Sequence, residues 1–179
     1  MGISNENIFL IKEDLPLSRI AKFFRPQDNR TKEFLASGQW SPSRSYEGHL
    51  VREEILKKSV TIAICTAPKG ETLRGVLKAI STDGWDYATL GGWYRYHTKF
   101  PFRKGEIIVT PGTTYLDEDY REWIPFVSSQ EDISFFQKII RRRNEIVAEI
   151  ILRPMSDLTR FQSEKRILVS RTIKEEKIS

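Results

Sequence analysis

The stretch DGWDYATLGGWYRYHTKFPFRKGEIIVTPGTTYLD, residues 83–117, decides how this chain is interpreted. It contains two of the four Trp and four of the six Tyr residues, and no acidic residue lies between Asp86 and Glu106. Two strand-like runs meet at residues 90–93, where a two-residue Gly-Gly loop is a strong signal for a β-hairpin. We therefore expect an aromatic, basic hairpin, which is either a ligand-binding surface or the core hairpin of a small β-domain.

Such a hairpin would place alternate side chains on two faces. The first face is either a bare platform that stacks nucleobases or, in the interpretation we favour, ordinary core, because large aromatic side chains usually dominate cores. This face gathers Trp85, Tyr87, Tyr94 and Tyr96. The second face is the better candidate for contact with a partner, and it carries Trp93, Arg95, His97 and then Lys99.

The same register places Asp86 opposite His97. A carboxylate beside an imidazole holds one tautomer and raises its pKa, as in a general acid–base pair. The sequence places no nucleophile near this pair, so a structural cross-strand pair is favoured over catalysis.

Length and composition indicate one folded, soluble domain. The chain has 179 residues, and its 11% aromatic content argues against disorder. We expect a single α+β domain over residues 1–179, with a helical part at 1–45, a β-rich core at 46–127 and a helical part with a last strand at 128–179.

The charge of the chain favours an acidic partner. The formal net charge is +5 and the isoelectric point is near 9.3, which suits nucleic acid or another polyanion, although many basic proteins use such charge only for solubility. The single cysteine, Cys65, lies in an apolar run and is expected to be an inert buried thiol. We see neither a signal peptide nor an apolar segment of about 20 residues, so we expect no membrane and a cytoplasmic location.

Helices are expected near the N-terminus and short strands in the middle. Residues 8–11 resemble a strand, residues 17–24 have helical spacing, and Asp28 is placed to cap a second short helix. Residues 60–66 predict a strand buried on both faces, while residues 73–80 fit strand or helix, with strand favoured by the Gly and Val that they contain. Further strands are expected at 106–110, 113–116 and 167–173.

In the C-terminal part of the sequence, the spacing of the apolar residues changes from that of strands to that of a helix. Residues 128–131, Ser-Ser-Gln-Glu, match a capping box, and the apolar residues after them repeat at helical spacing up to Pro154. They predict one long helix, although residues 145–152 are rich in β-branched side chains and fit a strand as well. The expected fold class is α+β: a small antiparallel β-barrel or curled sheet, with N-terminal helices and a long C-terminal helix packed on it.

The leading functional hypothesis is a non-catalytic nucleic-acid-binding or accessory protein, without a cofactor or a metal. Basic side chains would contact phosphates, and Trp93 is a candidate for stacking. The candidate nucleic-acid-binding residues are Trp93, Arg95, His97, Lys99, Arg103, Lys104, Arg141, Arg142 and Arg143.

Two alternatives remain open. One is a protein-interaction subunit of a larger assembly, with Trp40 or Trp123 as a contact. The other is a metal-dependent nuclease that uses the acidic cluster of Asp117, Glu118, Asp119 and Glu122, because paired carboxylates bind Mg²⁺. Walker A, dinucleotide-binding, Cys/His zinc and Gly-x-Ser-x-Gly motifs are absent from the sequence, which lowers the odds of a nucleotide-driven or hydrolytic enzyme.

Overall fold

The computed structural model describes residues 2–3, 9–11, 17–37, 41–42, 60–119, 121–130 and 148–172. The described helices are α1 (Leu17–Ile20), the 3-10 turn η1 (Ala21–Phe23), α2 (Asn29–Ser37), α4 (Leu73–Ser81) and α5 (Leu90–His97). The described strands are β1 (Gly2–Ile3), β2 (Phe9–Ile11), β3 (Phe24–Pro26), β4 (Ser41–Pro42), β5 (Val60–Ala67), β6 (Asp86–Tyr87), β7 (Ile107–Val109), β8 (Thr113–Leu116), β9 (Glu122–Ser128), β10 (Ala148–Pro154) and β11 (Lys165–Thr172).

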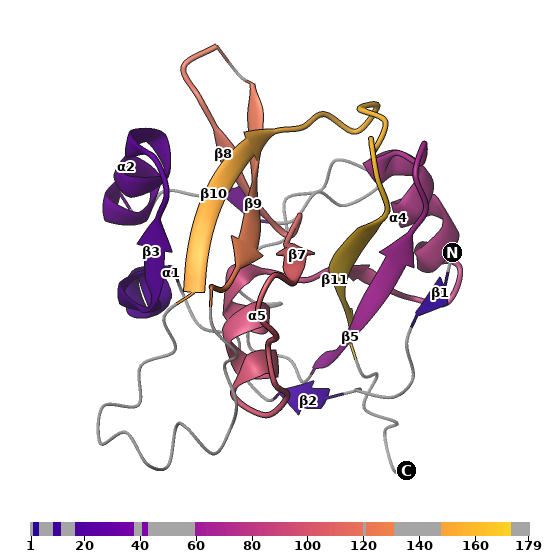
Figure 1. Cartoon of the computed structure of the whole chain (residues 1–179). Coiled ribbons are helices and arrows are strands. Elements are labelled where there is room, and N and C mark those ends of the chain that lie inside the picture. Colours follow the sequence, from indigo (N-terminus) through magenta and orange to yellow (C-terminus); the bar gives the residue numbers. More distant parts are fainter. Residues whose placement is uncertain are drawn as a thin grey trace, which may run out of the picture.

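The strands form a mixed, open sheet rather than the predicted antiparallel barrel. Its main path runs β1-β5-β11-β7-β9-β10-β3, and β2, β4, β6 and β8 pair with strands along this path. The pairs β11–β7 and β10–β3 are parallel, and the other pairs are antiparallel. A barrel would require the two ends of the path to pair. Within the described residues, β1 and β3 do not pair, and Figure 1 shows them on opposite sides of a strongly twisted sheet.

Helices cover both faces of the sheet, and β5 separates two cores. Its side chains alternate, so that Ile62 and Ile64 pack in the core that holds α5. Ala63 and Cys65 pack in the other core, which holds α4. The prediction of a strand at 60–66 that is buried on both faces is confirmed.

The predicted Gly-Gly hairpin is wrong, because residues 90–97 form helix α5. Thr89 has an extended backbone, and its hydroxyl oxygen accepts a hydrogen bond from the Gly92 amide at 3.1 Å, which caps the helix. A Cβ at Gly92 would lie 3.1 Å from Ile62 Cδ1, so this glycine allows α5 to pack tightly on β5. Glycine costs about 1 kcal/mol in a helix relative to alanine, and burial of Trp93 and Tyr96 offsets that cost.

Residues 73–80 form helix α4 rather than the favoured strand. The Thr72 hydroxyl oxygen caps it by accepting a hydrogen bond from the Gly75 amide at 3.0 Å. The side chains buried along α4 follow the helical spacing i, i+3, i+4 and i+7; they are Leu73, Val76, Leu77 and Ile80. This amphipathic pattern outweighs the β-propensity of single residues.

The second N-terminal helix is confirmed as α2, and Asp28 caps it as predicted, with its Oδ1 accepting a hydrogen bond from the Thr31 amide at 2.8 Å. The first helix is shorter than predicted, because the chain passes through η1 into β3. Strand β3 then pairs in parallel with β10. The predicted strands at 8–11, 106–110, 113–116 and 167–173 are confirmed as β2, β7, β8 and β11.

The prediction of a long C-terminal helix is wrong for the part that the structure describes. Ser128 ends strand β9, and Ala148–Pro154 is strand β10. Residues 131–147, where the middle of the helix was expected, lie outside the described residues. Alternate residues of β10 are buried, namely Ala148, Ile150 and Leu152, so this segment follows the strand period of two that its β-branched side chains favour.

Gly112 is predicted to be essential for the turn between β7 and β8. Its amide donates a hydrogen bond to the Ala88 carbonyl at 3.1 Å, and an added Cβ would lie 2.5 Å from the backbone carbon and oxygen of Ala88. Because backbone cannot move aside as a side chain does, Gly112→Ala should lower the free energy of unfolding by about 1–3 kcal/mol. Urea denaturation measures this, with Gly2→Ala as the control, since a Cβ there meets no atom within 4 Å. An unchanged midpoint for Gly112→Ala would contradict the assignment.

Candidate functional site

The structure divides the predicted nucleic-acid-binding residues into two groups. Trp93, Arg95 and His97 lie on α5, and Lys99, Arg103 and Lys104 lie on the segment that joins α5 to β7. We name this segment, residues 98–106, the basic loop. The three remaining candidates, Arg141, Arg142 and Arg143, lie outside the described residues.

Trp93 and His97 are core residues. The exposed fractions are 0% for Trp93 and 5% for His97, so the surface face predicted from the hairpin does not form. The Trp93 ring lies beside the rings of Phe24, His97 and Phe102, at centroid distances of 5.3, 4.9 and 5.2 Å. Arg95 is half-buried. The helical period of α5 therefore turns Trp93 and His97 into the core, where a strand period would have placed them on one face with Arg95.

His97 anchors the basic loop. Its Nδ1 lies 3.1 Å from the Phe100 carbonyl oxygen, and because a carbonyl only accepts, Nδ1 carries the proton. The buried Phe102 ring packs on the imidazole at 4.7 Å. Burial, the largest effect, and the positive charge of Arg166 together lower the pKa of His97 to about 4, against the opposing effect of the backbone acceptors at Phe100 and Pro101. His97 is thus neutral near pH 7 and holds the loop by a hydrogen bond and ring packing.

The predicted Asp86–His97 pair is absent. Asp86 lies on β6, opposite Ser170 of β11, and its Oδ1 accepts a hydrogen bond from the Tyr87 amide at 2.7 Å. The pair required the hairpin register, and helix α5 removes that register.

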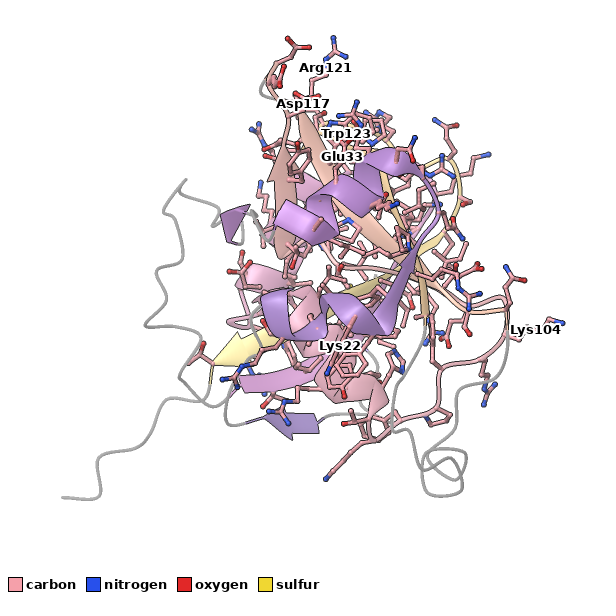
Figure 2. The ribbon with its side chains drawn as sticks, turned by 90° about the vertical axis from the view of Figure 1, so that its left-hand side faces the viewer. Lys22, Glu33, Lys104, Asp117, Arg121 and Trp123 are labelled. Atoms are coloured by element: carbon pink, nitrogen blue, oxygen red, sulfur yellow. The ribbon has the colours of Figure 1, made fainter. Side chains whose placement is uncertain are left out.

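The basic loop exposes its three cations and packs its two aromatic side chains against the protein. Lys99, Arg103 and Lys104 are exposed, whereas Phe102 is fully buried and Phe100 packs on Tyr96 at 4.8 Å. The turn at its end is closed by the Glu106 amide, which donates to the Arg103 carbonyl at 3.1 Å. The preceding amide, that of Gly105, donates to the Ser129 carbonyl beyond β9 at 3.0 Å. Figure 2 shows Lys104 extending away from the body of the protein.

The one acidic residue of the basic loop, Glu106, is paired within the protein. Glu106 Oε1 forms an ion pair with Arg166 Nη1 of β11, and Glu106 Oε2 accepts a hydrogen bond from the Arg103 amide at 3.1 Å. The side chains are 12% exposed for Glu106 and 42% for Arg166. Burial lowers the pKa of Arg166, and the positive charge of Arg103 contributes to this shift against the opposing effect of Tyr96.

The acidic cluster is built into the tip of the β8–β9 hairpin. Asp117 Oδ1 accepts hydrogen bonds from the amides of Asp119 and Arg121, at 3.0 and 2.8 Å, and Oδ2 accepts one from Trp123 Nε1 at 3.0 Å. The hydrogen bond from Trp123 is the largest of the effects that lower the pKa of Asp117. Arg30 of α2 lies 3.6 Å from Asp117 Oδ2 and 3.9 Å above the Trp123 ring. Figure 2 shows Asp117, Arg121 and Trp123 at this projecting end.

The Asp117 carboxylate therefore accepts hydrogen bonds from groups of the hairpin tip itself and so stabilises the shape of the tip. The Trp123 ring is covered by the Arg30 guanidinium and is not the bare contact that the sequence suggested. Among the described residues, no three His, Cys, Asp or Glu side chains are grouped so that they could hold a metal ion. Trp40 lies outside the described residues. Cys65 is buried, and burial raises the pKa of its thiol, as expected for an inert cysteine.

Sequence reasoning missed Arg166 and Glu106 as parts of one site. Arg166 begins a predicted strand, and nothing local distinguishes it from other basic residues at strand ends. The parallel pairing of β11 with β7, which places Arg166 opposite Ile108, brings it to the loop. The only available signal was the isolation of Glu106 at the end of a basic stretch.

Comparison of the chain with protein-family models, with curated proteins and with solved structures gives no match. Within the part of the chain that the structure describes, no helix is both long and apolar enough to cross a membrane. The exposed cations of the basic loop are therefore the basis for a proposed function.

The buried neutral His97 predicts a dependence of stability on pH. Its folded pKa of about 4 lies below the ordinary value of 6.5, so between these values the unfolded chain binds a proton that the folded chain does not. The free energy of unfolding should therefore fall as the pH falls through this window, by roughly 3 kcal/mol from this group. Urea denaturation at several pH values measures this loss.

The control is His97→Asn, which retains a donor for the Phe100 carbonyl but does not titrate. The variant will be less stable at pH 7, and its stability should depend less on pH between 6.5 and about 4. The same slope in both proteins would show that His97 does not carry the effect.

Proposed function

We propose that the protein binds nucleic acid without catalysis, through the phosphate groups, and that the basic loop is its main contact. The observation that carries this proposal is the exposure of Lys99, Arg103 and Lys104 on one segment whose single carboxylate is paired with Arg166. The net charge of +5 supports the same partner, because it draws polyanions toward the whole surface.

Anchoring of the loop supports binding as well. A flexible loop loses conformational entropy when it binds, whereas a loop already held by the core loses less. Phe102 in the core, the His97 hydrogen bond and the hydrogen bond to Ser129 hold the basic loop at three points. The aromatic residues that suggested base stacking in the sequence serve as anchors in the fold.

Further cations extend the basic surface. Arg19, Lys22 and Arg25 are exposed on the N-terminal segment from α1 to β3, and α1 contacts α5. The Phe23 ring stacks on Tyr94 of α5 at a centroid distance of 4.5 Å, which fixes η1 against the helix that leads into the basic loop. Nucleic acid that follows this surface would contact several cations in succession, and its affinity would fall as salt rises.

Charge reversal of the basic loop tests the proposal. The variant Lys99→Glu, Arg103→Glu, Lys104→Glu should bind a labelled single-stranded oligonucleotide at low salt at least about tenfold more weakly than the unaltered protein, because three phosphate contacts are lost. Fluorescence anisotropy at several salt concentrations measures the affinity and its salt dependence.

The matched control reverses three exposed cations beside or on α4, which covers the opposite face of the sheet: Lys69→Glu, Arg74→Glu, Lys78→Glu. Both variants change the net charge equally, so a larger loss in the loop variant locates the contact. Equal losses would show that only the net charge matters, and the absence of salt-dependent binding by the unaltered protein would remove the proposal.

A further inference from the structure

The aromatic pair of Phe23 and Tyr94 lies at the border between the core and the surface. The two rings stack at a centroid distance of 4.5 Å, with an angle of 19° between their planes. Both residues are partly exposed, although each packs against the core that holds α5. The next residue, Phe24, is buried against Trp93, so Phe23 is the ring that this segment keeps at the surface.

A lysine side chain lies over the Phe23 ring. Lys22 Nζ is 5.1 Å from the ring centroid, and Lys22 itself is exposed. Figure 2 shows Lys22 on the side of the protein that α1 and α2 form. A long exposed side chain has many rotamers, and its contact with an aromatic ring in water is weak. Lys22 can therefore leave the ring when a better partner for the ring arrives.

A nucleobase is such a partner. An exposed contact between a cation and an aromatic ring is worth a factor of about two to five in an equilibrium constant. Stacking of one base on an aromatic side chain is worth a factor of roughly five to 150. A base can thus take the place of Lys22 on the Phe23 ring, and the ammonium group is then close to the phosphate of the same nucleotide.

The surroundings of the aromatic pair have the charge that a nucleotide requires. Arg19 and Arg25 lie on either side of Lys22 in the sequence and are exposed, and no acidic residue lies between Leu17 and Gln27. The Thr98 amide donates to the Tyr94 carbonyl at 3.1 Å, so Tyr94 lies one helical turn before the basic loop. The aromatic pair and the basic loop therefore belong to one continuous surface.

We propose that Phe23, supported by Tyr94, stacks an unpaired nucleobase while Lys22 moves from the ring to the phosphate of that nucleotide. This role of Phe23 rests on the proposed function and restricts the partner to single-stranded nucleic acid, because the bases of a duplex are already stacked on one another. Trp93, the stacking candidate of the sequence, is fully buried and is excluded from this role.

Oligonucleotides with and without bases separate stacking from attraction between charges. An abasic strand carries the same phosphates, so the unaltered protein should bind a normal single strand at least about fivefold more tightly than the abasic strand. Phe23→Leu removes the ring and keeps an apolar side chain against the core. This variant should bind the normal strand at least about fivefold more weakly than the unaltered protein and the abasic strand equally well. Fluorescence anisotropy measures the four affinities.

The matched control is Tyr115→Leu. Tyr115 is also a partly exposed ring at the edge of the same core, and it forms an aromatic pair with Phe34 at a centroid distance of 5.7 Å. This variant should keep the preference for the normal strand. Thermal unfolding without oligonucleotide identifies any variant that does not fold. NMR keeps the test decisive in that case, because the Phe23 ring protons of the unaltered protein should show NOEs to base protons of the normal strand.

The salt dependence of binding tests the movement of Lys22. Lys22→Gln should lower the slope of the logarithm of the binding constant against the logarithm of the salt concentration by about 0.7, the value for one phosphate contact on a single strand. Phe23→Leu should leave this slope unchanged, because it removes no charge. An unchanged slope in Lys22→Gln would show that Lys22 does not contact phosphate.

The outcomes distinguish this inference from the proposed function. Equal affinity of the unaltered protein for normal and abasic strands would remove the stacking site and leave the proposed function in place. The same holds for a preference that survives in a folded Phe23→Leu protein, and for tighter binding of a duplex than of a single strand of equal length. Absence of salt-dependent binding to every oligonucleotide would remove the proposed function and the stacking site together.

Discussion

The burial of Trp93 sets the arrangement of the elements around it. Its indole has no exposed surface and lies beside rings of β3, α5 and the basic loop, at Phe24, His97 and Phe102. Large aromatic side chains dominate the energetics of cores, so the position of this ring constrains how the residues around it can pack. Helix α5, with its Thr89 cap and its glycine against Ile62, is the arrangement that places this ring inside.

The burial of Trp93 and its neighbours also separates the aromatic residues from the basic residues of the stretch 83–117. In the sequence they alternate and suggest one mixed surface. In the fold, Trp93, Tyr96 and Phe102 are in the core, while Lys99 and Lys104 are in solvent on a loop that these rings hold in place. The aromatic side chains thus hold the loop in place, and the two lysines lie at the surface.

The parts of the fold that were predictable from sequence have strong local signals. The apolar run at β5 has β-branched residues on both faces, and Asp28 caps α2 by a hydrogen bond to an amide three residues later. The errors occurred where two local signals conflict. At α4, Gly75 and Val76 favour strand, whereas the spacing of the apolar residues favours helix, and burial against β5 decides for the spacing.

The composition of the candidate site is evident in the sequence: a basic segment around Lys99, Arg103 and Lys104, with aromatic residues beside it. Which of these side chains face solvent depends on the fold, because a helix and a strand distribute the same residues over different faces. The fold also brings Arg166 to Glu106, since the 59 residues between them carry no local signal for that contact and the parallel pairing of β11 with β7 produces it. Long-range pairing of this kind depends on how the whole sheet is assembled, and no window of sequence contains it.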